Sequence, residues 1–311
     1  MKKNYFLTLA VFTFLAVGAR VAVGQPTPPE AGVPVRVVVT VEAHKGKQIP
    51  VINRQDVMVH EGRDRDLVVD WVPAQGEHGA LELMILLDDS SNLTLGSQLE
   101  DIRKFIDAQP DTTLVGVAYM QDGIAQVVQN PTSEHALAAK SLRLPLGART
   151  VNGSPYFSLT DLVKRWPATT ARRAVIMATD GVDPLYGTGD LNDPYLDEAI
   201  DHALRAGVTV SAIYTPGIDH FGHSYWQTYW GQLYLSRLAE QTGGEAYYIG
   251  FTGAPVSFTP FLEDAARRLA NQYLLTFQAK PVKKAEWQRI RLMTEVPHAD
   301  LVAPEKVWVQ P

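Results

Sequence analysis

The segment Leu81–Leu87 is a nearly unbroken apolar run, and it constrains the fold more than any other part of the chain. Apolar residues without alternation are typical of a strand buried on both faces of a parallel sheet. The run stops at the polar segment Asp88–Asn92. Polar side chains directly after a central strand lie where open α/β sheets carry their sites. Because Asp, Ser and Asn also favour turns and helix caps, a simple capping turn is the competing interpretation.

Strand and helix patterns alternate from residue 80 to 271, which predicts a doubly wound, mostly parallel α/β sheet. The further strands are expected at Leu114–Met120, Ile124–Val128, Ala174–Ala178, Val208–Tyr214 and Ala246–Ile249. The helices are expected at Gln98–Ala108, Ser133–Leu142, Phe157–Trp166, Leu191–Ala206, Leu233–Thr242 and Phe258–Asn271.

Short β patterns occur on both sides of this region, in residues 33–75 and 272–311. The expected strands are Val35–Val41, Ile49–Ile52, Val57–His60, Leu67–Trp71, Tyr273–Ala279, Gln288–Thr294 and Val307–Gln310. We expect them to pair into one small β domain built from both termini.

The first 24 residues resemble an export signal. Lys2 and Lys3 precede an apolar core at Tyr5–Val17, and Ala22–Gly24 fits a small-x-small cleavage site. An uncleaved membrane anchor is the alternative, and residues 25–32 are interpreted as a proline-containing linker. The chain has no cysteine, which excludes disulfides and thiolate metal sites. We therefore expect an exported protein, periplasmic or extracellular, whose stability rests on its packed core.

The net charge of the chain argues against two classes of binding partner. The formal net charge is −6 and the isoelectric point is about 5.8, which argues against nucleic acid or an anionic membrane surface as the main partner. Arg172 and Arg173 precede a buried strand, and we interpret them as a solvated turn between helix and strand.

Three polar segments distant in sequence are expected at one edge of the sheet, because the carboxyl ends of parallel strands lie together. They are Asp88–Asn92, Gly153–Ser154 and Asp180–Gly181. Two carboxylates facing each other would raise one pKa, and a divalent cation would remove that cost. Oxygen ligands without Cys or His favour Mg²⁺, Mn²⁺ or Ca²⁺.

These segments resemble the metal-ion-dependent adhesion site of the von Willebrand factor type A domain. That family has Asp-x-Ser-x-Ser, then a Thr, then Thr-Asp-Gly; this chain has Asp88–Asn92, Asn152–Ser154 and Thr179–Asp183. Three flanking segments look like a bacterial secreted subfamily: Asp56–Gly62, Leu238–Gly244 and Asn271–Leu275.

Residue by residue, Asp88, Ser90 and Asp180 match the family pattern, while Asn92 stands in for a Ser and Ser154 for the Thr. The resemblance implies that these five residues bind a divalent ion, with Mg²⁺ expected and Mn²⁺ or Ca²⁺ as alternatives. It also implies that an acidic side chain of a partner protein completes the coordination, so the activity is binding and not catalysis.

Two other functions remain open. The first is a structural module of a cell-envelope assembly in which the site is degenerate and binds no ion. The second is a divalent-metal-dependent hydrolase, which lacks a recognisable general base because no histidine falls in the motif segments. Asp89 is interpreted as an acid at the start of a helix that points outward.

The segment Pro216–Trp230 is expected to be a loop. It contains two histidines, His220 and His223, which have no helical register to hold a metal and are interpreted as solvated. Its aromatic residues are interpreted as a recognition surface, with a lid over the sheet as the alternative: Phe221, Tyr225, Trp226, Tyr229 and Trp230.

Overall fold

The computed structural model describes residues 32–44, 47–90, 93–147, 153–186, 192–216, 225–248 and 257–311. The predicted signal peptide and all but the last residue of the predicted linker lie outside these ranges. No helix in the described part of the chain has the length and apolar character needed to cross a membrane.

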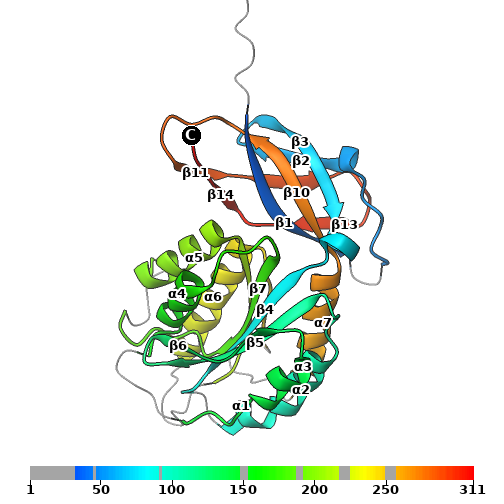
Figure 1. Cartoon of the computed structure of the whole chain (residues 1–311). Helices are drawn as coiled ribbons and strands as arrows, with labels where there is room; N and C mark the ends of the chain where they lie inside the picture. Colours follow the sequence, from blue (N-terminus) through cyan, green and yellow to red (C-terminus); the bar gives the residue numbers. More distant parts are fainter. Residues whose placement is uncertain are drawn as a thin grey trace, which may run out of the picture. The chain divides into compact units, whose positions relative to one another are not determined.

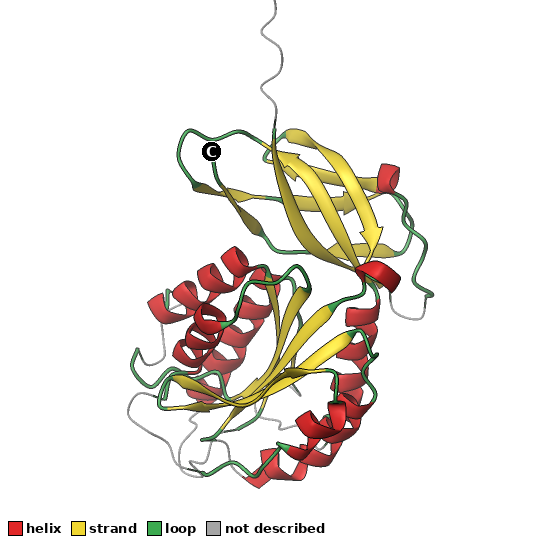
Figure 2. Cartoon of the chain, viewed as in Figure 1, coloured by secondary structure: helices red, strands yellow, loops and turns green. Residues whose placement is uncertain are grey.

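A six-stranded sheet forms the centre of the α/β region (Figures 1 and 2). Its order is β6-β5-β4-β7-β8-β9, and every neighbouring pair is parallel except β5 with β6. The strands are β4 Leu81–Asp88, β5 Thr113–Gln121, β6 Ile124–Thr132, β7 Arg172–Thr179, β8 Val208–Tyr214 and β9 Ala246–Tyr247. The apolar run Leu81–Leu87 therefore forms the central strand β4.

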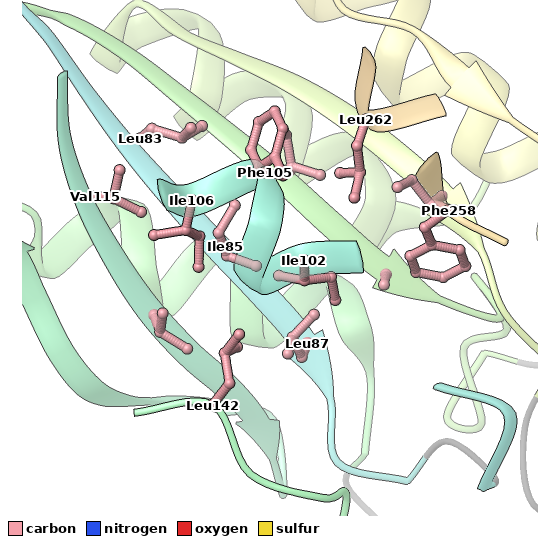
Figure 3. Close-up of a cluster of buried hydrophobic side chains, with 14 of the residues drawn as sticks. Leu83, Ile85, Leu87, Ile102, Phe105, Ile106, Val115, Leu142, Phe258 and Leu262 are labelled. Carbon is pink, nitrogen blue, oxygen red and sulfur yellow. The ribbon is translucent and has the colours of Figure 1, made fainter. Parts of the chain in front are cut away.

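Helices cover both faces of this sheet (Figure 2). They are α1 Leu93–Ser97, α2 Leu99–Asp107, α3 His135–Lys140, α4 Pro155–Arg165, α5 Pro194–Ala206, α6 Tyr225–Thr242 and α7 Thr259–Ala270. Alternate residues of β4 contribute to two cores, because side chains of a strand point to opposite faces. Leu83, Ile85 and Leu87 pack with α2 and α7, as Figure 3 shows, while Met84 and Leu86 pack with α4, α5 and α6.

Helix α5 shows how local sequence sets these elements. Asp193 caps its start by accepting hydrogen bonds from the N–H groups of Tyr195 and Leu196, and Pro194 occupies the first turn. The helix ends at Gly207, which adopts φ 64° and ψ 35°, a left-handed conformation that glycine enters without steric cost. The predicted stop at this glycine is therefore observed.

Strands from both ends of the chain form a second six-stranded sheet, in the order β12-β2-β3-β10-β1-β13. Its strands are β1 Val33–Ala43, β2 Val57–Glu61, β3 Asp64–Pro73, β10 Gln272–Ala279, β12 Arg291–Thr294 and β13 Ala299–Val302. β11 Glu286–Arg289 and β14 Lys306–Val309 form a separate pair. β1 pairs antiparallel with β10 from Val33↔Ala279 to Thr40↔Gln272, as Figure 1 shows for the blue and orange strands.

Several sequence-based elements need correction. Residues Ile49–Ile52 form no strand, and β13 was not expected. The expected strand Gln288–Thr294 is two strands, because Ile290 separates β11 from β12 and the two join different sheets. Alternation of apolar residues across Ile290 hides this break, since the pattern reports burial and not the pairing partner.

Candidate functional site

Asp88 is the last residue of β4, and both oxygens of its carboxylate are hydrogen-bonded. Oδ1 accepts hydrogen bonds from the Ser90 backbone N–H at 2.9 Å and from the Ser90 hydroxyl at 2.6 Å. Oδ2 accepts a hydrogen bond from the Thr179 hydroxyl at 2.7 Å. Because Thr179 ends the neighbouring strand β7, side chains as well as backbone join the two strand ends.

Asp180 directly follows Thr179 and is buried, and its Oδ1 accepts a hydrogen bond from the N–H of Val182 at 2.9 Å. Asp88 is 6% exposed. Burial, and after it the negative charge of Asp180, raises the pKa of Asp88 to about 6. The two acids of the sequence motif therefore face the same buried region and repel each other.

The loop that carries Asp180 is held by close backbone packing. Gly181 has φ +69°, and a Cβ at this position would lie 2.5 Å from the carbonyl oxygen of Gly231 in α6. A Cβ on Gly231 would in turn lie 2.1 Å from the carbonyl oxygen of Asp180. The buried Tyr156 hydroxyl donates a hydrogen bond to the Gly181 carbonyl at 2.7 Å. Glycine at both contact points lets α6 approach the loop, which fixes the position of Asp180.

Ser154 lies directly before α4 and is fully buried. Its hydroxyl donates a hydrogen bond to Oδ2 of Asp183 at 2.6 Å. Oδ1 of Asp183 accepts hydrogen bonds from the N–H groups of Leu185 at 2.7 Å and Tyr186 at 3.2 Å. This network places Ser154 against the same loop that carries Asp180.

Four of the five predicted ligands thus lie around two neighbouring strand ends. Asp88 and Ser90 lie at the end of β4. Asp180 lies in the loop after β7, and Ser154 lies directly before α4 and contacts this loop through Asp183. Asn92, the fifth predicted ligand, lies outside the described residues.

The donor set has the chemistry that a hard cation requires. All four described groups offer oxygen, and the hydroxyls of Ser90 and Ser154 each give their proton to a carboxylate while keeping lone pairs. Within the described ranges, no three His, Cys, Asp or Glu side chains form a group that could hold a metal by themselves. An ion bound here would therefore depend on the hydroxyl ligands as well as on Asp88 and Asp180.

Asp89 differs sharply from its neighbour, and the interpretation that it points outward is wrong. It is 2% exposed and forms a two-point ion pair with Arg143, with N–O distances of 2.6 and 2.9 Å. It also accepts hydrogen bonds from Gln121 and from the N–H of Leu146. Despite burial, the hydrogen bonds and charge of Arg143 hold the pKa of Asp89 below its usual value. Its carboxylate is thus fully used in anchoring the loop after α3.

Large apolar side chains are exposed near these polar groups. Of the fourteen exposed large hydrophobic residues in the described part of the chain, six belong to three segments that contact the site: Leu144, Leu146, Leu185, Tyr186, Tyr225 and Trp226. Leu144 and Leu146 follow Arg143, and the N–H of Leu146 bonds to Asp89. The N–H groups of Leu185 and Tyr186 bond to Asp183. Tyr225 and Trp226 begin α6, the helix that packs on the Asp180 loop. Exposed apolar side chains that gather in one patch are typical of protein-binding surfaces.

The expected loop at Pro216–Trp230 is only partly correct, because α6 begins at Tyr225. Residues 217–224, with both histidines and Phe221, lie outside the described residues. Tyr225 and Trp226 are 54% and 63% exposed, which favours a surface over a lid for this pair. The part of α6 from Leu233 onward was predicted, but its first turns were not, because the buried positions there are Thr228, Gly231 and Gln232 and lack the apolar pattern of a helix face.

Sequence reasoning gave no role to three residues of this network. Thr179 is recoverable from strand register, since Leu87 pairs with Ala178 and the next residues therefore face each other. Asp183 has a local signal, an acid three residues after Asp180. Arg143 has none, because its loop contacts Asp89 only through the tertiary fold.

The sheet order, the antiparallel edge strand and helices on both faces define a von Willebrand factor type A-like fold, so the fold prediction is confirmed. No family profile matches the chain, and a search of curated proteins gives no match.

Among solved structures, the chain is similar to a conserved hypothetical protein, BatB, from Bacteroides thetaiotaomicron, with 15% identity and a TM-score of 0.46 over 61% of this chain and 98% of that one. It is similar to an aerotolerance-related membrane protein from Bacteroides fragilis, with 14% identity and a TM-score of 0.42 over 61% and 98% of the two chains. It is also similar to the ArnB paralog VWA2 from Sulfolobus acidocaldarius, with 8% identity and a TM-score of 0.42 over 88% and 75%.

Proposed function

We propose that the protein is an exported binding module in which a divalent cation at the carboxyl edge of the sheet links it to a partner protein. Asp88, Ser90, Asn92, Ser154 and Asp180 would hold the ion, with Mg²⁺ preferred and Mn²⁺ or Ca²⁺ as alternatives. When bound, the ion supplies an open coordination position for an acidic side chain of the partner. The site of action is the periplasm or the cell exterior.

The observation that carries this proposal is the pairing of a hydroxyl with a carboxylate in both segments, after β4 and in the loop after β7. The Ser90 hydroxyl donates a hydrogen bond to Asp88, and the Ser154 hydroxyl donates one to Asp183. Because each hydroxyl gives its proton to a carboxylate, the lone pairs of its oxygen point elsewhere and can bind a cation. The repulsion between Asp88 and Asp180 is a cost that a cation would remove. The protein's groups here hold and orient oxygen atoms, which suits binding better than proton transfer.

The exposed apolar side chains extend the proposal from the ion to the partner. Tyr225 and Trp226 belong to the helix that packs on the Asp180 loop. Leu185 and Tyr186 follow Asp183, which accepts hydrogen bonds from their N–H groups. Aromatic side chains near the centre of an interface usually contribute most of the binding energy. We therefore expect a partner that presents an acidic residue beside an apolar surface.

One observation favours a second candidate, a structural envelope module whose site binds no ion. Both oxygens of Asp88 already accept hydrogen bonds, so the network satisfies this carboxylate without a cation.

Calorimetric titration with Mg²⁺, Mn²⁺ and Ca²⁺ separates the two candidates. The wild type is expected to bind at least one ion, and Asp180→Ala to lose affinity by about 100-fold, because a ligand and its charge are both removed. Asp107→Ala removes an equally charged but exposed aspartate from the end of α2 and is expected to bind as the wild type does. No heat with any of the three ions would leave the structural module as the function.

A capture experiment from envelope extract then tests the partner. Capture is expected with Mg²⁺, and to be lost with chelator and with Asp180→Ala. Trp226→Ala is expected to weaken capture while leaving the calorimetric ion affinity unchanged, because Trp226 is 63% exposed and belongs to the surface. Capture that is indifferent to chelator would contradict an ion-mediated contact.

A further inference from the structure

A groove of about 670 Å³ lies at the opposite edge of the α/β sheet, where β7 and β8 begin. It is bordered by the first residues of β7, the end of α5, β14 and the segment Val33–Val38 of β1. The ligands proposed above lie at the other ends of the strands, so the groove is separate from the candidate metal site.

The lining of this groove is strongly basic. Five cationic side chains line it, and no Asp or Glu does: Arg36, Arg172, Arg173, Arg205 and Lys306. The whole chain has a formal net charge of −6, so this concentration of positive charge opposes the charge of the rest of the molecule. A concave surface lined by one sign of charge concentrates the field and attracts ligands of the opposite sign.

In the described part of the chain, Arg36, Arg172 and Arg205 have no carboxylate partner, while Arg173 is attracted by Glu82 without forming a close ion pair. Lys306 pairs with Asp201 at 2.7 Å, but no ion pair is formed by Arg36, Arg172, Arg173 or Arg205. Arg205 instead lies over the ring of Trp308, with its guanidinium carbon 3.7 Å from the ring centroid. Stacking fixes the guanidinium in place and leaves its charge uncompensated.

Arg172 shows the same imbalance inside the protein, and the interpretation of Arg172 and Arg173 as a solvated turn is wrong for it. It is 8% exposed, and its acceptors are neutral: the carbonyls of Leu269, Ala74 and Gly79 and the side chain of Gln272. Its Nε donates to no acceptor. A buried guanidinium with neutral partners strengthens the positive potential at the base of the groove.

The groove also borders an open strand edge. On the side away from β10, β1 pairs with β13 only over Thr40–Ala43. After β13 the chain continues into β14, whose backbone pairs with β11 and not with β1. Six consecutive residues of β1, from Val33 to Val38, line the groove, which is expected where a strand presents its edge and not one face. Alternate residues there direct backbone N–H and C=O groups away from β10.

We propose that this groove binds an extended acidic peptide segment of a partner protein, which adds as a strand to the edge of β1. Backbone groups of the peptide would pair with residues 33–38, and its carboxylates would face Arg36, Arg173 and Arg205. Addition of a strand to a free edge gives affinity through main-chain hydrogen bonds, while the flanking pockets give specificity. A small anion such as phosphate would satisfy the cations but not the strand edge, so an extended peptide fits the groove better.

The test uses fluorescence anisotropy of the purified full chain with labelled eight-residue peptides. A peptide that alternates Glu and Val is expected to bind, and a peptide that alternates Lys and Val is expected to bind at least about tenfold more weakly. Arg36→Glu and Arg205→Glu are each expected to reduce affinity for the acidic peptide about tenfold, since both side chains are exposed and reverse a local charge. Lys140→Glu makes the same charge change on α3, outside the groove, and is expected to remain within about twofold of wild type.

A second pair of probes separates strand addition from simple anion binding. The acidic peptide methylated on alternate backbone nitrogens keeps its charge and loses donors, and it is expected to bind at least about tenfold more weakly. Equal binding of the methylated peptide, or equal competition by pyrophosphate or single-stranded DNA, would overturn the proposal in favour of a general anion site. Chelator is expected to leave peptide binding unchanged, so failure of the metal proposal and failure of this one are distinguishable.

Discussion

The two edges of the α/β sheet differ in the sign of the charge that is buried or concentrated there. At the carboxyl edge, Asp88 and Asp180 are both buried. Asp88 accepts hydrogen bonds from two hydroxyl groups and one backbone N–H. At the amino edge, Arg172 is buried among neutral acceptors and Arg205 stacks on tryptophan. Buried negative charge is therefore concentrated at one edge of the sheet and positive charge at the other, and the two proposals above rest on this difference.

Asp89 shows what a compensated charge looks like in the same molecule. It is adjacent to Asp88 and similarly buried, yet its two-point pair with Arg143 shifts its pKa in the opposite direction. Charge left without a partner is therefore a property of particular positions and not of burial itself. Such positions are candidates for function, since structural ion pairs are available nearby.

The largest effect is expected from removing the compensation at Asp89. Arg143→Met keeps an apolar stem over Tyr119 but leaves a buried carboxylate without its cation, which should lower the free energy of unfolding by about 3 kcal/mol. Urea denaturation in chelator measures this change. Asp89 would then be a buried acid without a cation beside it, as Asp88 is, which breaks the contrast between Asp88 and Asp89.

A double variant provides the control for this prediction. Adding Asp89→Asn to Arg143→Met removes the unpaired charge and is expected to restore most of the lost stability, because the remaining amide can still accept hydrogen bonds. If Arg143→Met alone lowers the free energy of unfolding by less than about 1 kcal/mol, the Asp89–Arg143 pair contributes no more than an exposed ion pair does.

The next effect concerns the pH dependence of stability through Asp88. Its pKa is about 6 in the folded protein and about 3.9 when unfolded, so the folded state binds the proton more tightly. The contribution of Asp88 to stability therefore rises as pH falls from about 7 to 4, by about 2–3 kcal/mol, and the ionised form costs stability above pH 6. Asp88→Asn cannot titrate, so the wild-type advantage over this variant should grow by that amount over the same range in chelator.

Magnesium sharpens this test. At saturating Mg²⁺ the pH dependence assigned to Asp88 is expected to disappear, because a bound cation stabilises the ionised carboxylate. Chemical denaturation at four or five pH values, with and without Mg²⁺, gives both curves. Identical curves in the two conditions would mean that Asp88 does not experience a bound ion.

The smallest effect is expected at the amino edge. Asp201→Asn removes the carboxylate that pairs with Lys306 and leaves all five cations of the groove without a partner of this kind. Affinity for the acidic peptide should increase about two- to fivefold, while the free energy of unfolding changes by less than about 1 kcal/mol because the pair is partly exposed. Anisotropy and urea denaturation measure the two quantities. Weaker peptide binding would show that Asp201 positions Lys306 for the peptide.

The fold was predictable from the sequence because apolar runs and glycine stops report burial and helix ends directly. β8 matches its predicted bounds, and α5 ends at the predicted glycine. The predicted elements are wrong where contacts between distant segments decide the secondary structure. Ile290 separates two strands of different sheets, and the aromatic start of α6 lacks a clear apolar stripe.

The candidate site was predictable as far as it follows strand ends. Asp88, Ser90 and Asp180 belong to segments that directly follow apolar strands, so topology alone places them together. The position of Ser154 depended on the resemblance, and its partner Asp183 emerged only from the structure. The pairing of Asp89 with Arg143 and the burial of Arg172 were not predictable, since residue type indicates neither the partner nor the exposure of a charge.

The pairing of β1 with β10 has a consequence for biosynthesis. β1 leaves the ribosome early, whereas its partner strand follows the entire α/β region and emerges late. The α/β region can thus complete its own order while β1 waits with both edges free to pair with other chains. Because both neighbours of β1 in the sheet, β10 and β13, follow the α/β region in sequence, the β domain can close only after that region has been synthesised.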